Sequence, residues 1–261
     1  MAINYIQGEK FLKLSDEKKI FYVDTHNVHN FLKNPPKNKF VLISHNSDGN
    51  ITKNPKRINS GSSNDCFFDI DNLPKNLVKW FGQNVDVENE ILESIPIGLE
   101  NSCWFPETKK IEKIEAIRKQ DKNYTNLLYI NHNINTNQTE RQKPYDILKS
   151  EKWCTIEYGR NGENFDHYLQ MLHSHTFVLC PQGNGLDTHR LWETLYVNSI
   201  PVVRKNINNK FYTDLPICII NDWHELNEDF LKKEFIRINK LKHNLDKLDF
   251  NFWKNKIESV I

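Results

Sequence analysis

The stretch CPQGNGLDTHRLWE, residues 180–193, gathers side chains that could bind a phosphate-bearing ligand. Gly183 and Gly185 permit positive φ and a close approach of the ligand to the backbone. Arg190 falls in the first turn of the helix predicted to follow, where its guanidinium could grip a diphosphate through two hydrogen bonds. Glu193 lies one turn later on the same face, and a carboxylate there suits the two vicinal hydroxyls of a ribose. Backbone amides, arginine and carboxylate therefore match the diphosphate and ribose of one nucleotide.

A buried strand must precede these residues and a helix must follow them. The segment TFVLC is short and apolar throughout, which predicts a central strand, and Pro181 stops its hydrogen-bond ladder. Thr188 or Asp187 is a suitable N-cap for the helix, whose positive dipole end would face the ligand. The predicted donor-binding residues, with Arg141 added from a separate segment, are Arg141, Gly183, Asn184, Gly185, Thr188, His189, Arg190 and Glu193. The competing interpretation is a tight structural connection, since the segment matches neither the Walker loop nor GxGxxG.

Apolar runs of strand length alternate with amphipathic stretches along the whole chain, which predicts an α/β protein with parallel sheets. In the first half we expect a strand over 39–45, a helix over 72–84, a strand entering a loop over 94–102 and a surface helix within 107–123. The second half repeats strand and helix in the manner of a doubly wound domain. We therefore predict two Rossmann-like domains with a cleft between them, residues 1–120 and 121–261, the last helix packing back on the first domain.

The segment FVLCPQGNGLDTHRLWETLYVNSIPVV, residues 177–203, resembles the donor-binding segment of exostosin-like glycosyltransferases. Weaker likeness to small soluble viral and bacterial members covers residues 80–101 and 129–143. The resemblance implies the two-domain GT-B fold, inverting chemistry, and transfer from a nucleotide-sugar, most often a UDP-sugar, to a glycan acceptor. It also implies that Arg190 binds the diphosphate and Glu193 the ribose. The chain departs from the family in lacking a membrane anchor and in its short first half.

Inversion at a sugar carbon requires a general base near the acceptor hydroxyl. The base in a GT-B enzyme usually follows a strand of the first domain, and VLISHNSDG provides Asp48 as first choice and His45 as second. The alternative is an Asp-Gly turn and a histidine that caps a strand. Arg141 follows the first strand of the second domain and could neutralise the leaving diphosphate, or could be an ordinary surface partner. Tyr158 and Arg160 could contact the nucleobase, or could simply be surface residues.

Composition excludes several other classes of protein. The 261 residues carry a net charge of +1, so no overall field recruits nucleic acid. The sequence shows no signal peptide and no apolar run long enough to span a membrane, which predicts a cytoplasmic protein, or one of the host cytoplasm if the chain is viral. The five cysteines are scattered, and the histidines and cysteines show no metal-ligand spacing, so neither a metal nor a cofactor is expected. Two alternatives remain open: a non-catalytic module that binds a nucleotide-sugar or a glycan, and a nucleoside-diphosphate hydrolase.

Overall fold

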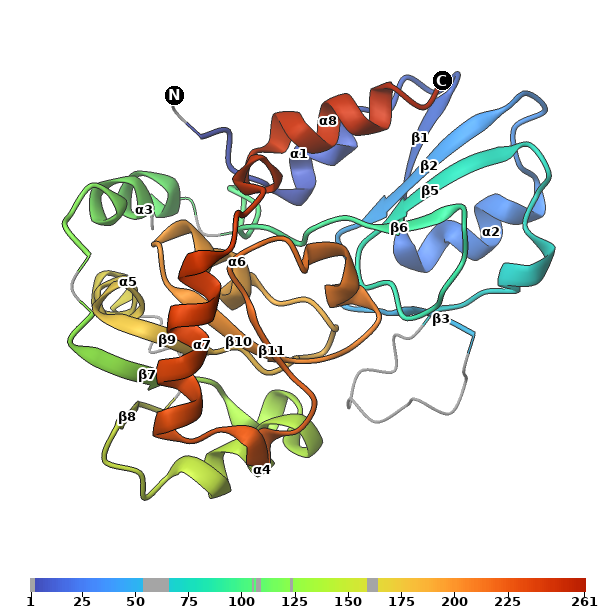
Figure 1. The fold of residues 1–261 in the computed structure, drawn as a ribbon. Coiled ribbons are helices and arrows are strands. Elements are labelled where there is room, and N and C mark those ends of the chain that lie inside the picture. The colour runs from blue at the N-terminus through green and yellow to red at the C-terminus, as the bar shows by residue number, and fades with distance from the viewer. Residues whose placement is uncertain (1–2, 54–65, 105, 107–108, 123, 159–163) are drawn as a thin grey trace.

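The structure is a computed structural model and describes residues 3–53, 66–104, 106, 109–122, 124–158 and 164–261. It is an α/β protein with two parallel sheets of four and five strands and a two-stranded pair beside the first sheet (Figure 1). The strands are β1 (Ile20–Asp24), β2 (Phe40–His45), β3 (Ile51–Thr52), β4 (Cys66–Phe67), β5 (Leu77–Gly82), β6 (Leu92–Ser94), β7 (Asn126–Ile130), β8 (Cys154–Ile156), β9 (His175–Leu179), β10 (Ile200–Arg204) and β11 (Cys218–Ile220). The helices are α1 (Gly8–Leu12), α2 (Val28–Lys33), α3 (Lys110–Arg118), α4 (Gln138–Leu148), α5 (Phe165–Ser174), α6 (His189–Tyr196), α7 (Glu228–Lys240) and α8 (Phe250–Glu258).

The first sheet has the strand order β1-β2-β5-β6. Every residue of β2 is buried, so the strand presents apolar side chains to both faces of the sheet. Phe40 and Leu42 pack toward α2, whereas Val41 and Ile43 enter the core cluster that also contains Phe11 of α1. The strand expected over 39–45 is therefore confirmed, and it lies inside the sheet.

The second sheet has the order β11-β10-β9-β7-β8, which places β9 at its centre as the apolar segment predicted. Its faces are covered separately, because alternate residues of a strand point to opposite sides. Leu128 and Phe177 pack in one cluster with Leu231 of α7, and Tyr129 and Val178 pack in another with residues of α5 and α6. Helices on both faces of a parallel sheet make this half doubly wound.

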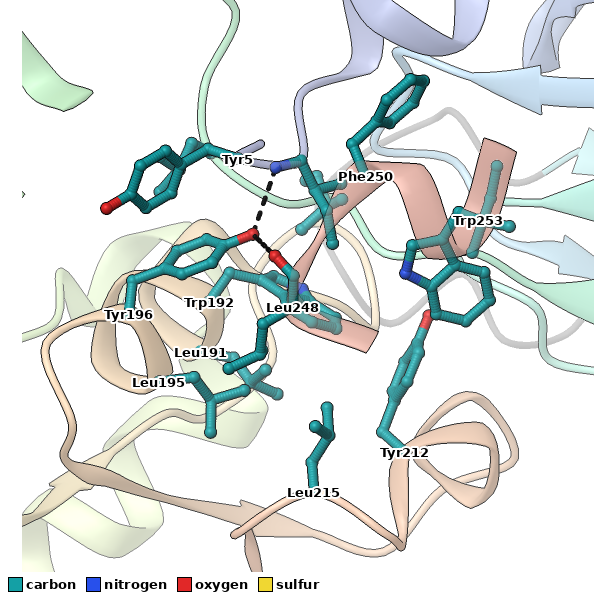
Figure 2. Packing of buried hydrophobic residues seen from close by; sticks show 14 of the residues in the cluster. Tyr5, Leu191, Trp192, Leu195, Tyr196, Tyr212, Leu215, Leu248, Phe250 and Trp253 are labelled. Carbon is teal, nitrogen blue, oxygen red and sulfur yellow. Dashed lines mark hydrogen bonds between the residues drawn. The ribbon is translucent and has the colours of Figure 1, made fainter. Parts of the chain in front are cut away.

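One apolar core joins the two sheets, because residues of both belong to the same buried cluster. Figure 2 shows the part of this core where Tyr196 of α6 meets the N-terminal segment: its hydroxyl accepts a hydrogen bond from the Ile6 amide at 3.1 Å and donates one to the Leu248 carbonyl at 2.9 Å. Helix α8 lies beside α1 (Figure 1), with the Phe250 ring edge-on to Phe11 at 5.1 Å.

Three expectations for the first half were wrong or incomplete. The strand expected within 94–102 lies earlier, because β6 ends at Ser94 and residues 95–98 belong to no strand. The segment 72–84 contains strand β5 in place of a helix, because the adjacent side chains Trp80 and Phe81 enter core clusters on opposite faces of the sheet. A helix would have directed neighbouring residues only about 100° apart. Strand β1 was not predicted, since it is an edge strand with partly exposed residues and a weaker apolar signal. The helix within 107–123 is present as α3, and Ile114 and Ile117 are its buried residues.

Candidate functional site

The strand order of the second sheet fixes where a ligand would be expected. Counted from the β8 edge, the strands of this sheet have the order 2-1-3-4-5 along the chain. The next strand after β7 is added on one side of it and all later strands on the other, so the switch point lies between β7 and β9. Loops that leave the carboxyl ends of two such strands diverge to opposite faces and open a crevice between them. The loop after β7 begins with Asn131 and His132, and the loop after β9 is the glycine-containing segment 180–188.

Arg141 lies under that glycine-containing loop. It is in the first turn of α4 and is buried, with Nε donating to the Gln182 carbonyl at 3.0 Å and Nη1 to the Asn133 carbonyl at 2.8 Å. Burial and the nearby charge of Arg190 lower the pKa of Arg141 to about 10. Arg141 thus lies near the start of α4, the helix that follows β7, with its guanidinium against the glycine-containing loop.

Arg190 is the second residue of α6 and is also buried. Its guanidinium carbon lies 5.9 Å from the centre of the Tyr168 ring, and its Nε is buried without a hydrogen-bond partner in the described part of the chain. Two neighbouring buried cations repel each other, and a buried donor without an acceptor is destabilising. An anion bound between them would relieve both effects.

His132 joins the two arginines and was not singled out from the sequence. Its Nε2 donates to the Arg141 carbonyl at 3.0 Å, while its Nδ1 is buried with no partner among the described residues. Burial, together with the charges of Arg190 and Arg141, lowers the pKa of His132 to about 4, so the ring is neutral at neutral pH. The signal was available: His132 lies two residues beyond the end of β7, and His45 is the last residue of β2, so both lie near the carboxyl end of a strand.

A cavity of about 440 Å³ opens at the same edge of the second sheet, within the size range of small-molecule sites. Gly183, Asn184 and Thr188 of the predicted set line it. Further lining comes from the first turn of α4, from the basic segment 204–210 after β10, and from Asn50 and Asp86 of the first half. Both halves of the chain therefore contribute to this cavity.

The two glycines serve a different purpose from the one predicted. Among the described glycines only Gly98 has a positive φ, so neither Gly183 nor Gly185 adopts the left-handed conformation. A Cβ on Gly183 would lie 2.8 Å from Nη2 of Arg141, and one on Gly185 would lie 2.4 Å from Nδ2 of Asn84. Both glycines leave room for protein side chains, Arg141 and Asn84, which approach the backbone closely.

Hydrogen bonds hold the glycine-containing loop against the first half of the chain. Asn184 donates to the Asp48 carboxylate at 3.0 Å, and the Asp187 amide donates to Asn84 at 2.9 Å. The buried Asp187 carboxylate accepts from the Ile97 amide and from the Trp192 indole, both at 2.9 Å. Burial raises the pKa of Asp187 to about 6. The loop is therefore a joint between the two halves as well as a wall of the cavity.

The start of α6 follows the prediction in part. Thr188 is the N-cap residue, but its side chain makes no capping hydrogen bond. The Glu193 side chain has no exposed surface: it accepts from the Tyr168 hydroxyl at 2.8 Å and lies 3.4 Å from the Lys110 ammonium. In this arrangement the carboxylate ties α6 to α3 and α5, and it offers no surface to a ribose.

The two predicted bases occupy very different environments. His45 is buried, and both ring nitrogens are engaged, Nε2 donating to the Pro96 carbonyl at 2.9 Å and Nδ1 accepting from the Asn46 amide at 2.8 Å. Burial lowers the pKa of His45 to about 4. The Asp48 carboxylate is exposed at the contact between the halves, where a substrate could reach it.

Tyr158 and Arg160 were predicted as weak nucleobase contacts. Tyr158 is exposed and its hydroxyl is hydrogen-bonded to the Tyr145 hydroxyl, outside the cavity lining, and Arg160 lies outside the described residues. Across the described ranges no group of three or more His, Cys, Asp or Glu side chains could hold a metal ion. The same ranges contain no helix that is long and apolar enough to cross a bilayer.

Comparison with known proteins yields no assignment. Neither the models of known families nor the curated proteins gave a match to this chain. The fold is that of an α/β protein, and two buried cations, Arg141 and Arg190, lie near one edge of its second sheet.

Proposed function

We propose that the protein is an inverting, metal-independent glycosyltransferase of GT-B type that uses a nucleotide-sugar, with a UDP-sugar as the first donor to test, and a glycan acceptor. The observation that carries this proposal is the pair of buried arginines, Arg141 and Arg190, at the switch point of a doubly wound sheet. A diphosphate supplies the negative charge that this pair lacks, and ligands of such sheets bind at this position.

The arginines would act most strongly during the reaction. As the bond between the sugar and the diphosphate breaks, negative charge grows on the leaving diphosphate, and fixed cations in a buried site stabilise that charge. The neighbouring cavity, with its basic segment 204–210, would accommodate the rest of the nucleotide. No metal is required in this scheme because the arginines neutralise the diphosphate.

The test is a thermal-shift panel with UDP, GDP, CDP and ADP on the wild type and two variants. Arg190→Met removes one cation of the pair while keeping a long side chain. Arg237→Met is the matched control, because Arg237 is exposed and paired with Glu234 on the outer helix α7. We expect at least one nucleotide to raise the melting temperature of the wild type and of the control but not that of Arg190→Met. Equal shifts in all three proteins would refute the diphosphate site.

A second candidate is a non-catalytic module that binds the same ligand. The engaged nitrogens of His45 favour it, because they remove one of the two predicted bases from catalysis. The two candidates are separated by incubation with UDP-sugars and a mixture of acceptor sugars, followed by assay of released UDP. Nucleotide binding without UDP release under any combination would support the module, and release without acceptor would indicate a hydrolase.

A further inference from the structure

A second cavity, of about 580 Å³, lies next to the first and takes no part in the diphosphate site. Asp48 lines this second cavity, and its hydrogen-bond partner Asn184 lines the first. The walls of the two cavities therefore touch at the Asp48–Asn184 hydrogen bond.

The lining of the second cavity has the composition of a carbohydrate site. Its polar side chains are mostly short amides, hydroxyls and carboxylates, which exchange hydrogen bonds with sugar hydroxyls. They include Asn46, Ser47, Gln83, Glu100 and Asn101. Trp104 adds the one large aromatic surface of this lining and is 69% exposed. An exposed indole of this size is unusual on a protein surface and provides a flat apolar face for the C–H side of a sugar ring.

His189 provides this cavity with a histidine whose tautomer is fixed. Its Nδ1 lies 2.8 Å from the Gly98 carbonyl oxygen, which only accepts hydrogen bonds, so Nδ1 carries the proton and Nε2 holds a free lone pair. Gly98 has a φ of +65°, and a Cβ there would meet the Ile6 carbonyl oxygen at 2.4 Å. The carbonyl that orients His189 thus depends on a position that only glycine can occupy.

The other histidines of the cavity are less suited to act as bases. Both nitrogens of His45 are engaged, as described above. Nε2 of His26 is already hydrogen-bonded to the Ser47 hydroxyl at 2.8 Å. His189 is half-buried, and its Nε2 makes no hydrogen bond to any described residue. Asp48 remains the rival, but an imidazole is a stronger base than a carboxylate.

We propose that the second cavity binds the acceptor sugar, which stacks on Trp104 and presents a hydroxyl to Nε2 of His189. The catalytic part of this inference rests on the proposed glycosyltransferase function, whereas the binding part does not. In the reaction, Nε2 takes the proton of the acceptor hydroxyl, and the hydroxyl oxygen bonds to the anomeric carbon of the donor sugar. The bond from that carbon to the diphosphate oxygen breaks, and the nucleoside diphosphate leaves with the electron pair.

Sugar binding is tested by saturation-transfer NMR with methyl glycosides of glucose, galactose, mannose, fucose and N-acetylglucosamine, with and without saturating UDP. We expect transfer to at least one glycoside with the wild type and its loss with Trp104→Ala. Tyr124→Ala is the matched control, since Tyr124 is another exposed aromatic residue and lines a different groove. Undiminished transfer with Trp104→Ala, or no transfer to any glycoside in either arm, overturns the carbohydrate site.

The role of His189 is tested with His189→Asn, because the asparagine amide can still donate to the Gly98 carbonyl but cannot accept a proton. We expect kcat to fall at least 100-fold, with nucleotide and glycoside binding retained. Burial lowers the pKa of His189, so wild-type kcat/KM should be constant at high pH and decline only on the acid side. Other titratable groups near His189 or in the same cavity are His26, His45, Asp48, Glu100, Lys110 and Glu193. Retained turnover in His189→Asn, with loss in Asp48→Asn, would assign the base to Asp48.

The two proposals fail in different ways. If no nucleotide shifts the melting temperature but a glycoside binds through Trp104, the carbohydrate site stands and the glycosyltransferase function falls. If UDP binds and is released by turnover while Trp104→Ala changes neither KM for the acceptor nor transfer to glycosides, the acceptor binds elsewhere.

Discussion

Replacing Arg190 by methionine should stabilise the protein in the absence of an anion. A pKa lowered from 12.5 to about 10 for Arg141 corresponds to about 3 kcal/mol of unfavourable free energy for its charged form. Burial is the larger cause and Arg190 the next, so removing Arg190 should recover the smaller part of this free energy. The variant also removes the buried Nε of Arg190, which has no hydrogen-bond partner among the described residues. A buried donor without a partner destabilises a protein by about 1–3 kcal/mol, and the variant escapes this cost.

Opposing losses reduce this gain without cancelling it. The stacking of Arg190 over Tyr168 contributes about 0.5–1 kcal/mol, and methionine retains most of the apolar packing. We therefore expect Arg190→Met to raise the free energy of unfolding by about 1–2 kcal/mol. Most substitutions of buried residues act in the opposite direction, so the sign alone is informative.

The assay is urea unfolding in an anion-poor buffer, repeated with pyrophosphate. In the first buffer the midpoint should rise for Arg190→Met at an unchanged m-value, and Arg237→Met should stay within about 0.5 kcal/mol of wild type. Pyrophosphate at 100 times its Kd should stabilise the wild type by about 2.7 kcal/mol and leave Arg190→Met unaffected. A loss of 1 kcal/mol or more in the anion-poor buffer would refute the inference that this arginine is held at a cost to stability.

Three further predictions concern stability. Because burial lowers the pKa of His45 and of His132 to about 4 from 6.5, the unfolded chain takes up these protons first as pH falls. The free energy of unfolding should therefore be highest above pH 6.5 and fall by up to about 3 kcal/mol for each histidine as the pH is lowered toward 4. In urea titrations at several pH values, His45→Asn should reduce this dependence on pH. Gly185→Ala should lower the free energy of unfolding by about 1–3 kcal/mol, since the added Cβ would meet Asn84 at 2.4 Å. An unchanged melting temperature in calorimetry would show that the loop moves away and would contradict this prediction. Glu193→Gln should lower stability by about 2 kcal/mol through its buried contacts, and a changed nucleotide KM at unchanged stability would instead support the ribose role.

The alternation of apolar and amphipathic segments was sufficient to predict the second sheet. Its strands are short, apolar and separated by helices with clear periodicity, so local pattern and tertiary structure agree. The segment around Trp80 failed because its apolar residues fit the helical spacing as well as the strand, and only the sheet shows that neighbouring side chains are buried on opposite faces. This error also concealed Asn84, which follows β5 and holds the glycine-containing loop.

The candidate site could be predicted as a set of residue types but not as a geometry. The pairing of Arg141 with Arg190 follows from the strand order, which places two loops far apart in sequence at one edge. Glu193 was placed on the same helical face as Arg190, but the sequence could not show that α3 covers this face with Lys110. The sequence could not show that His189 contacts the Gly98 carbonyl, because Gly98 comes from the other half of the chain.

The position of α8 has a consequence for how the chain acquires its structure during synthesis. Domains of many proteins fold as soon as their own segment has left the ribosome. Here Phe11 and Tyr5 of the N-terminal segment belong to the same buried cluster as Phe250, Trp253 and Ile257, so the two groups are separated by most of the chain. The first half cannot complete its core until residues 250–257 have been made. Until then, the apolar surface around α1 stays open to chaperones or to other nascent chains.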